Sequence, residues 1–279
     1  KVAPFLGYDR DPYMVISKEG KLFWIQDAYT VSSNYPYSTP VTGGYFNYIR
    51  NSVKVVIDAY NGTMDFYIID QKDPVAEVYK NIFPQLFKNF DQMPEDLKQH
   101  IRYPKDLFQV QAELYSTYHM TDPDVFYNKE DYWNVPNEIY AENEIKMEPY
   151  YIVTKLPGHE RVEFILMTPF TPSTKNNMIA WLAAKNDQPE YGDLVVYKFP
   201  KEKLIFGPMQ IEARIDQDSE ISQQLTLWGQ KGSTVIRGNL LVIPIEKSII
   251  YVEPLYLRAE TGEIPELKRV IVSNGYDVV

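Results

Sequence analysis

The sequence contains no cysteine and only three histidines, and these two shortages remove several classes of site. Without cysteine, the chain can form no disulfide, no thiolate zinc site and no cysteine nucleophile. The histidines, His100, His119 and His159, are scattered along the chain, so the paired histidines of an HExxH metal site are absent. A metalloprotease-type centre is therefore not expected.

Catalytic signature motifs and long apolar runs are also missing. The sequence has no P-loop, no GxSxG, no GxGxxG and no zinc signature. Its longest clear apolar run covers only residues 240–245, whereas about 18 to 20 apolar residues are needed to span a bilayer. The residues themselves therefore name no reaction and predict no membrane-spanning helix.

Basic residues are outnumbered, because 28 Lys and Arg stand against 38 Asp and Glu and give a formal net charge of -10. Such an acidic chain repels phosphate backbones and anionic lipid head groups. Nucleic acid is therefore not expected as a partner. Solubility is the simplest interpretation of the charge.

Apolar residues make up 44% of the 279 residues and occur along the whole length, which predicts a folded protein of one large or two modest domains. Hairpin patterns occur at both ends, while repeated prolines divide residues 73–133 into short helices. We therefore expect an α+β fold, with antiparallel β-sheets and an inserted cluster of short helices. One sheet system fits the pattern, and so do two lobes, residues 1–148 and 149–279.

The clearest local signal is Asn61-Gly62, which joins two strand-like segments in residues 53–70. A two-residue type I′ turn at this dipeptide would place Asp58 directly opposite Asp65. Like charges opposed across two strands are destabilising unless they face water, share a proton or bind a cation. Two carboxylates facing water are the favoured interpretation, and a calcium site at Asp58 and Asp65 is the alternative.

Helical periodicity predicts further helices outside the hairpins. Residues 104–119 begin with proline and carry an apolar face that ends at His119, which we interpret as a packed, hydrogen-bonded histidine. A serine or threonine is expected to cap a helix over residues 173–185, and Ser219 to cap another that ends at Gly229. Strands are predicted for residues 150–156, 162–168, 194–199, 235–245, 249–257 and 270–272.

Arg237 lies in a predicted strand that is apolar on both faces apart from this residue and Asn239. An arginine is costly to bury without a partner, so it should reach an acid in the stretch before it, where the plausible partners are Glu212, Asp216, Asp218 and Glu220. A structural ion pair and a polar ligand site are both consistent with this pairing. The candidate binding cluster consists of Arg214, Asp216, Asp218, Glu220, Trp228 and Arg237.

Several long strings, in the same order, resemble the uncharacterised protein family 0182, a group of large bacterial and archaeal membrane proteins. They include WIQDAYT, NYIRNSVKVVIDAYNGT, RYPKDLFQVQ, EARIDQD, LTLWGQKGS, RGNLLVIPI and YVEPLYL. The resemblance implies that several membrane helices precede a large domain outside the cell, and that this chain is the soluble extracytoplasmic portion. The membrane-spanning region upstream of Lys1 would then be its first partner. The family offers no catalytic residue to transfer.

Three hypotheses for function remain open from the sequence. A non-enzymatic ectodomain that binds a ligand, an envelope component or a partner protein fits the missing motifs and needs no cofactor. A hydrolase with paired carboxylates, acting on an envelope glycan, would need two acids in an open, aromatic-lined cleft. An assembly module would use exposed sheet edges or aromatic loops.

Overall fold

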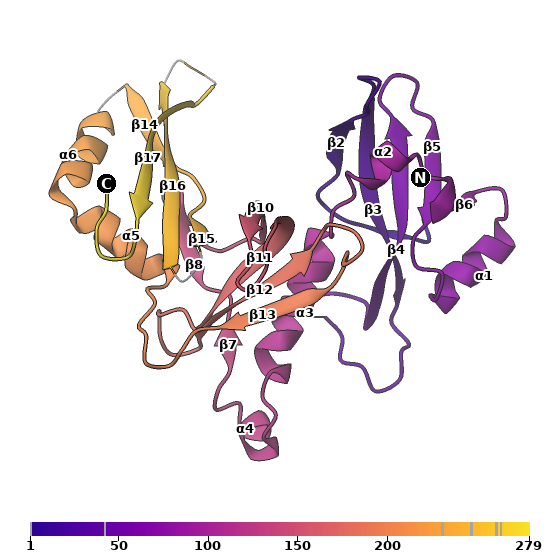
Figure 1. Cartoon of the computed structure of the whole chain (residues 1–279), viewed down its shortest axis with the longest axis horizontal. Helices are drawn as coiled ribbons and strands as arrows, with labels where there is room; N and C mark the ends of the chain where they lie inside the picture. Colours follow the sequence, from indigo (N-terminus) through magenta and orange to yellow (C-terminus); the bar gives the residue numbers. More distant parts are fainter. Residues whose placement is uncertain (1, 42, 230–231, 246–247, 260–261, 263) are drawn as a thin grey trace. The chain divides into compact units, whose positions relative to one another are not determined.

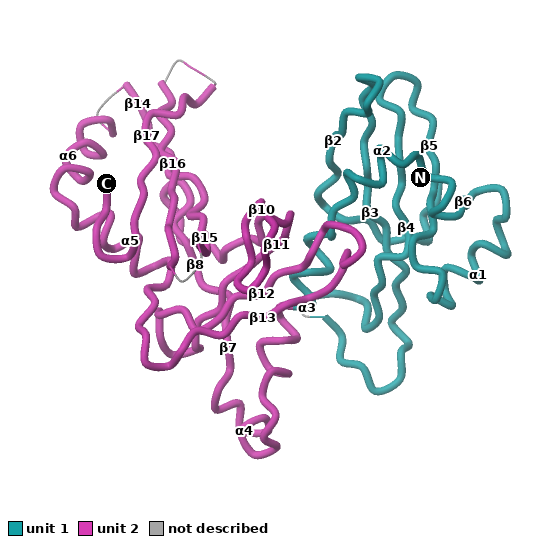
Figure 2. Tube along the Cα trace, in the orientation of Figure 1, with its two compact units in different colours: residues 1–111 teal, residues 112–279 magenta. Residues whose placement is uncertain are grey.

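The computed structural model describes residues 2–41, 43–229, 232–245, 248–259, 262 and 264–279. Lys1, upstream of which the membrane region is expected, lies outside these residues. The chain has the expected α+β fold, built from antiparallel sheets and short helices (Figure 1). It divides into two compact units, Lys1–Gln111 and Ala112–Val279 (Figure 2).

Unit 1 is built on a six-stranded sheet in the order β1-β3-β4-β5-β6, with β2 pairing β3 beside β1. Its strands are β1 (Gly7–Tyr8), β2 (Tyr13–Ile16), β3 (Leu22–Ser32), β4 (Tyr48–Asp58), β5 (Met64–Ile68) and β6 (Phe87–Asn89). All pairs are antiparallel except β5 with β6. Residues on one face, among them Val53, Val55 and Phe66, form a core with Ala76 and Phe87.

The expected cluster of short helices is confirmed between residues 73 and 133. It comprises α1 (Pro74–Ile82), the 3-10 turn η1 (Phe90–Gln92), α2 (Glu95–Lys98), α3 (Lys105–Tyr118) and α4 (Pro123–Asn128). Asp73 caps α1 and also accepts hydrogen bonds from Thr30 and Ser52, both buried on the sheet. This one carboxylate therefore fixes the start of the helix against the strands.

The register predicted for the hairpin of β4 and β5 is wrong, and with it the opposition of Asp58 and Asp65. Val56 stands opposite Asp65, while Asp58 is the last residue of β4 and stands opposite Phe23 of β3. The carboxylate of Asp58 accepts the backbone N–H groups of Tyr60 and Asn61, at 2.8 and 3.0 Å. This side chain builds a longer turn than the expected two-residue one, because it satisfies backbone groups that would otherwise continue the ladder.

Unit 2 contains a second sheet in the order β10-β11-β12-β13, with β7 pairing the end of β11. The strands are β7 (Trp133–Asn134), β10 (Tyr150–Lys155), β11 (Val162–Pro172), β12 (Ala180–Lys185) and β13 (Leu194–Lys198). A separate hairpin joins β8 (Asn137–Tyr140) to β9 (Asn143–Lys146). The hairpin predicted from residues 150–156 and 162–168 is thus confirmed.

The helix expected over residues 173–185 is wrong, because its second half is strand β12. All six residues of β12 are buried, and the strand pairs with β11 on one side and β13 on the other. Trp181 on β12 stacks on Tyr197 of β13, with 4.3 Å between ring centroids. A central strand covered on both faces loses the apolar-polar alternation that marks a strand, so its sequence is indistinguishable from that of a buried helix.

The third sheet, also in unit 2, is formed by β14 (Ser233–Arg237), β15 (Leu241–Ile245), β16 (Ser248–Ala259) and β17 (Glu266–Ser273). Helices α5 (Pro208–Gln217) and α6 (Ser219–Trp228) pack along it, as Figure 1 shows. The strand predicted for residues 235–245 is divided at Gly238, whose N–H donates to Pro254 O. A Cβ there would lie 2.7 Å from the Pro254 ring, so only glycine fits.

The boundary between the units lies inside α3, rather than after residue 148. Residues 112–148 belong to unit 2 because β7 pairs with β11 and because Glu138 accepts the backbone N–H of Leu240 at 2.8 Å. Over the residues described, no helix combines the length and the apolar character required to cross a membrane.

Candidate functional site

Arg237 is held in a buried cluster of carboxylates at the end of β14. Its Nε donates to Glu253 Oε1 at 2.6 Å and its Nη1 to Asp216 Oδ1 at 2.7 Å, while Nη2 bonds both Glu253 and Glu212. Glu212 and Asp216 stand four residues apart on α5, so both face the sheet. The expectation that Arg237 pairs with an acid in this stretch is confirmed for Glu212 and Asp216 but not for Asp218 and Glu220, while Glu253 on β16 is an additional partner.

The cluster holds more negative charge than positive charge. Glu212 and Glu253 are both buried, whereas Asp216 is largely exposed. Burial, and then the neighbouring charge of Glu253, raise the pKa of Glu212 to about 8. Burial also raises the pKa of Glu253, against the opposing effect of Arg237. One arginine does not neutralise two buried carboxylates, so the pair retains a proton near neutral pH.

This cluster positions the hairpin of β8 and β9. Glu212 Oε1 accepts the N–H of Ile139 at 3.2 Å, and the carbonyl oxygen of Arg237 accepts the N–H of Ala141 at 2.8 Å. Glu138, buried on the same hairpin, accepts from Asn239 Nδ2 at 2.9 Å. The ion cluster therefore fixes a hairpin that forms one wall of the polar pocket described below.

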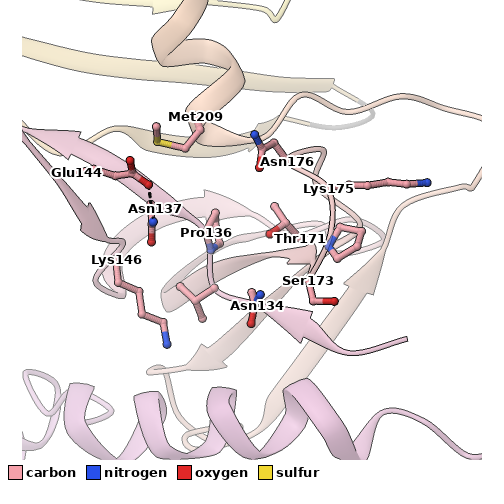
Figure 3. Close-up of a pocket in the computed structure, with 12 residues that line it drawn as sticks. Asn134, Pro136, Asn137, Glu144, Lys146, Thr171, Ser173, Lys175, Asn176 and Met209 are labelled. Carbon is pink, nitrogen blue, oxygen red and sulfur yellow. Dashed lines mark hydrogen bonds between the residues drawn. The ribbon is translucent and has the colours of Figure 1, made fainter. Parts of the chain in front are cut away.

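That pocket has a volume of about 520 Å³ and lies where β7, the β8–β9 hairpin, the end of β11 and the start of α5 meet (Figure 3). Figure 3 shows Glu144 and Asn137 facing each other on the hairpin, with Asn137 Nδ2 donating to Glu144 Oε1 at 2.6 Å. The residues that line it are Asn134, Val135, Pro136, Asn137, Glu144, Lys146, Thr171, Pro172, Ser173, Lys175, Asn176 and Met209.

The lining is dominated by exposed polar groups. Within the described part of the chain, the side chains of Asn134, Asn176, Lys146 and Lys175 have no hydrogen-bond or ion-pair partner. Amides donate and accept, whereas ammonium groups supply positive charge. The arrangement can therefore bind a hydroxyl-rich molecule that carries negative charge.

Gly207 fixes the start of α5 against this pocket. A Cβ at Gly207 would lie 1.8 Å from the carbonyl oxygen of Asn176, which lies in the loop after β11. Only glycine, which has no Cβ, therefore allows the start of α5 to approach this loop so closely. The N–H of Gly207 donates to Gln210 Oε1 at 2.9 Å, which closes the first turn. Met209 consequently reaches the pocket from α5 (Figure 3).

The structure distributes the sequence-predicted binding cluster over three places. Arg237 and Asp216 join the ion cluster, whereas Asp218, Glu220 and Trp228 line a smaller groove of about 280 Å³ beside β17. Asp218 Oδ1 caps α6 by accepting the N–H groups of Glu220 and Ile221. Arg214 lies elsewhere, with its guanidinium carbon Cζ 4.4 Å from the centroid of the Phe206 ring. The six residues therefore do not form a single site.

His119 is packed, as expected from its place at the end of the apolar helix face. Its Nδ1 lies 3.0 Å from Tyr115 O, and its ring stacks on Trp133 with 3.7 Å between centroids. Within the described residues, no group of three or more His, Cys, Asp or Glu side chains could hold a metal ion. Asp65 instead pairs with Lys88 at 2.7 Å.

The pocket residues were missed by sequence reasoning for a physical reason. They come from segments that are separate in the chain, and each one is an ordinary polar residue on a turn or strand end. Glu253 offered a signal, because an acid inside the apolar string YVEPLYL requires a buried partner. The sequence could therefore have predicted that Arg237 also pairs with Glu253, an acid on a strand.

The model of the uncharacterised protein family UPF0182 matches residues 1–228. A UPF0182 protein of Desulforamulus reducens is 59% identical over 279 residues, and one of Pelotomaculum thermopropionicum is 61% identical over 279 residues. A UPF0182 protein of Methanospirillum hungatei is 58% identical over 281 residues, which cover 99% of this chain and 31% of that protein.

The matches to the proteins of Desulforamulus reducens and Pelotomaculum thermopropionicum cover all of this chain and 30% of each relative. The chain therefore spans about a third of the length of the proteins it matches. No solved structure matches the chain. The family match over most of the chain and these identities lead to one conclusion: the chain belongs to the uncharacterised protein family UPF0182.

Proposed function

We propose that this chain is the ligand-binding, non-catalytic portion of a larger membrane protein, and that it binds an acidic oligosaccharide of the cell envelope in the pocket of Figure 3. The observation that carries the proposal is the lining of this pocket. It combines three amides, two hydroxyls and two ammonium groups in one concave surface. Its volume of about 520 Å³ lies within the range of ligand pockets, roughly 300 to 1,000 Å³.

Amides and hydroxyls match the alternating donors and acceptors of sugar hydroxyl groups. Pro136, Pro172 and Met209 add apolar surface on which the faces of a sugar ring can rest. Lys146 and Lys175 favour a ligand with carboxylates, because the whole chain is otherwise acidic and these two charges stand without a described ion-pair partner.

Binding is favoured over hydrolysis by the count of acids. Among the residues that line the pocket, all of them described, Glu144 is the one carboxylate, and it is engaged with Asn137. Glycoside hydrolysis by the common mechanisms needs two carboxyl groups across the scissile bond, about 5 to 9 Å apart. The smaller groove has two acids, and each has a structural contact. Asp218 caps α6, and Glu220 accepts a hydrogen bond from Gln224 Nε2.

Isothermal titration calorimetry with trigalacturonate as an acidic probe and maltotriose as a neutral one tests the proposal. We expect micromolar to millimolar binding of trigalacturonate, which Asn137→Ala and Lys146→Ala each weaken about tenfold. Lys155→Ala, a change at an exposed lysine of β10 outside the pocket, is the matched control and should bind as the unchanged protein does. Equal affinity of all four proteins would refute the pocket, and release of shorter sugars would favour the hydrolase.

The extracytoplasmic location is tested separately in cells that produce the full-length protein. Tyr60 is exposed in the turn after β4, so Tyr60→Cys presents a thiol in a chain that has none. A membrane-impermeant maleimide should label this variant above the background of the unchanged protein in intact cells. Labelling that appears only after cell lysis would place this portion inside.

A further inference from the structure

The outer edge of β17 forms backbone hydrogen bonds along only part of its length. Along its inner edge β17 pairs with β16. On the outer edge the described residues show one short contact with the end of the chain. There the N–H of Val272 donates to Val279 O at 2.8 Å and the N–H of Val279 donates to Val272 O at 3.0 Å. Ser273 forms the neighbouring bridge with Val278.

Val270 carries the next set of outward backbone groups. In an antiparallel ladder, alternate residues of a strand point their N–H and C=O toward the same neighbour, so Val270 faces the edge that Val272 uses. The opposite strand agrees with this assignment, because Val270 stands across from Pro254, which has no N–H to exchange. Among the described residues, no backbone group pairs with this N–H and C=O, which point toward the space beyond β17.

That space is the groove of about 280 Å³ between β17 and α6. Arg269, Val270 and Ile271 form its floor, while Ile221 and Trp228 of α6 form its apolar wall. Figure 1 shows the end of the chain lying between α6 and β17. A free strand edge beside an apolar wall is the arrangement that accepts an added strand.

We propose that this groove is a strand-acceptor site, filled in the full-length protein by an extended segment that lies outside residues 1–279. The related proteins are long enough to supply it, because this chain covers 30% of each of the two bacterial relatives. A strand that extended the pairing of Val279 with Val272 would run antiparallel beside Ile271, Val270 and Arg269 in turn.

The geometry of the groove determines which side chains the added segment can carry. The side chain across from Ile271 would point to the same face as Ile271, which is buried in the core cluster that Ile221 and Trp228 pack against, so that position takes an apolar residue. The next position, across from Val270, would face away from α6 and can be polar. The added strand is therefore an alternating apolar and polar segment of at least three residues beyond the existing pair.

Hydrogen-deuterium exchange measured by mass spectrometry tests the proposal on residues 1–279 and on the full-length protein. We expect the peptide that contains Val270 to exchange at least about tenfold more slowly in the full-length protein, together with reduced exchange in α6. A peptide from β13, in the neighbouring sheet, should exchange equally in both. Equal exchange of the Val270 peptide in the two proteins would overturn the proposal.

Val270→Pro removes the outward N–H without removing a bond to β16, and Val270→Thr retains that N–H as the matched control. In the full-length protein, Val270→Pro should abolish the extra protection of α6, whereas Val270→Thr should keep it. If protection in residues 1–279 alone rises with protein concentration, the groove accepts a second copy instead, and the assignment to a segment of the same protein is overturned.

Discussion

Replacement of Glu212 by glutamine should remove a pH dependence of stability that the buried ion cluster creates. Burial and the charge of Glu253 raise the pKa of Glu212 to about 8 in the folded protein, from 4.5 as its ordinary value. The folded state therefore holds a proton that the unfolded state has released. Because the unfolded chain binds fewer protons between pH 4.5 and 8, the free energy of unfolding falls as pH rises across this window.

The size of the effect follows from the same gap. At about 1.36 kcal/mol per pKa unit, the distance from 4.5 to about 8 corresponds to roughly 5 kcal/mol, lost at no more than about 1.4 kcal/mol per pH unit. Stability from this group is complete below pH 4.5 and has disappeared above pH 8. Glutamine keeps the length of the side chain and an oxygen acceptor for Ile139, but it does not titrate, so this contribution to the slope vanishes.

Urea unfolding, followed by tryptophan fluorescence at several values from about pH 5 to pH 8, measures the slope. The unchanged protein should lose roughly 1 kcal/mol per pH unit, while Glu212→Gln should be nearly flat over the same interval. Glu220→Gln is the matched control, since Glu220 is an exposed acid on the next helix. If Glu212→Gln retains the slope of the unchanged protein, the protonated buried pair does not exist.

Gly207→Ala should destabilise unit 2 by about 3 kcal/mol or more in thermal unfolding, because the new Cβ would lie 1.8 Å from the Asn176 carbonyl oxygen; an unchanged melting temperature would contradict that approach. Arg237→Met should cost roughly 3 to 5 kcal/mol, since its two buried carboxylate partners lose their counter-charge, and the loss should be smaller at pH 5 than at pH 8 in the same urea assay. Lys54→Met should destabilise unit 1 by a similar amount, about 3 to 5 kcal/mol, because Lys54 and Asp27 form a fully buried ion pair; a loss below about 1 kcal/mol would show that Asp27 takes up a proton instead. Millimolar calcium should leave the melting temperature of the unchanged protein where it is, because the two hairpin carboxylates do not face each other.

The sequence predicted the fold class and most elements because hairpin and helix-start signals are local. Its errors arose where tertiary context decides. Strand β12 reads as a helix because both of its faces are buried, and the β4–β5 hairpin gains a longer turn because Asp58 accepts backbone N–H groups. Both features depend on neighbours or side-chain geometry that the strand and turn patterns do not encode.

The candidate site was only partly accessible from the sequence. An arginine buried in an apolar strand needs acids, so the cost of burying charge predicted a partner between Glu212 and Glu220, and the structure shows Glu212 and Asp216 in that role. The pocket did not follow, because Asn134, Asn137 and other lining residues meet only when the hairpin and α5 are placed. Of the residues predicted as a binding cluster, Arg237 instead holds one wall of the pocket, together with Glu212.

The most direct test of the proposed function follows the side-chain amide resonances of Asn134, Asn137 and Asn176 by NMR during titration with trigalacturonate. We expect all three to shift together with one dissociation constant, while the side-chain amide of Asn89, in unit 1, stays in place. Shifts confined to the groove beside Trp228, or no shift at any of the three asparagines, would contradict it.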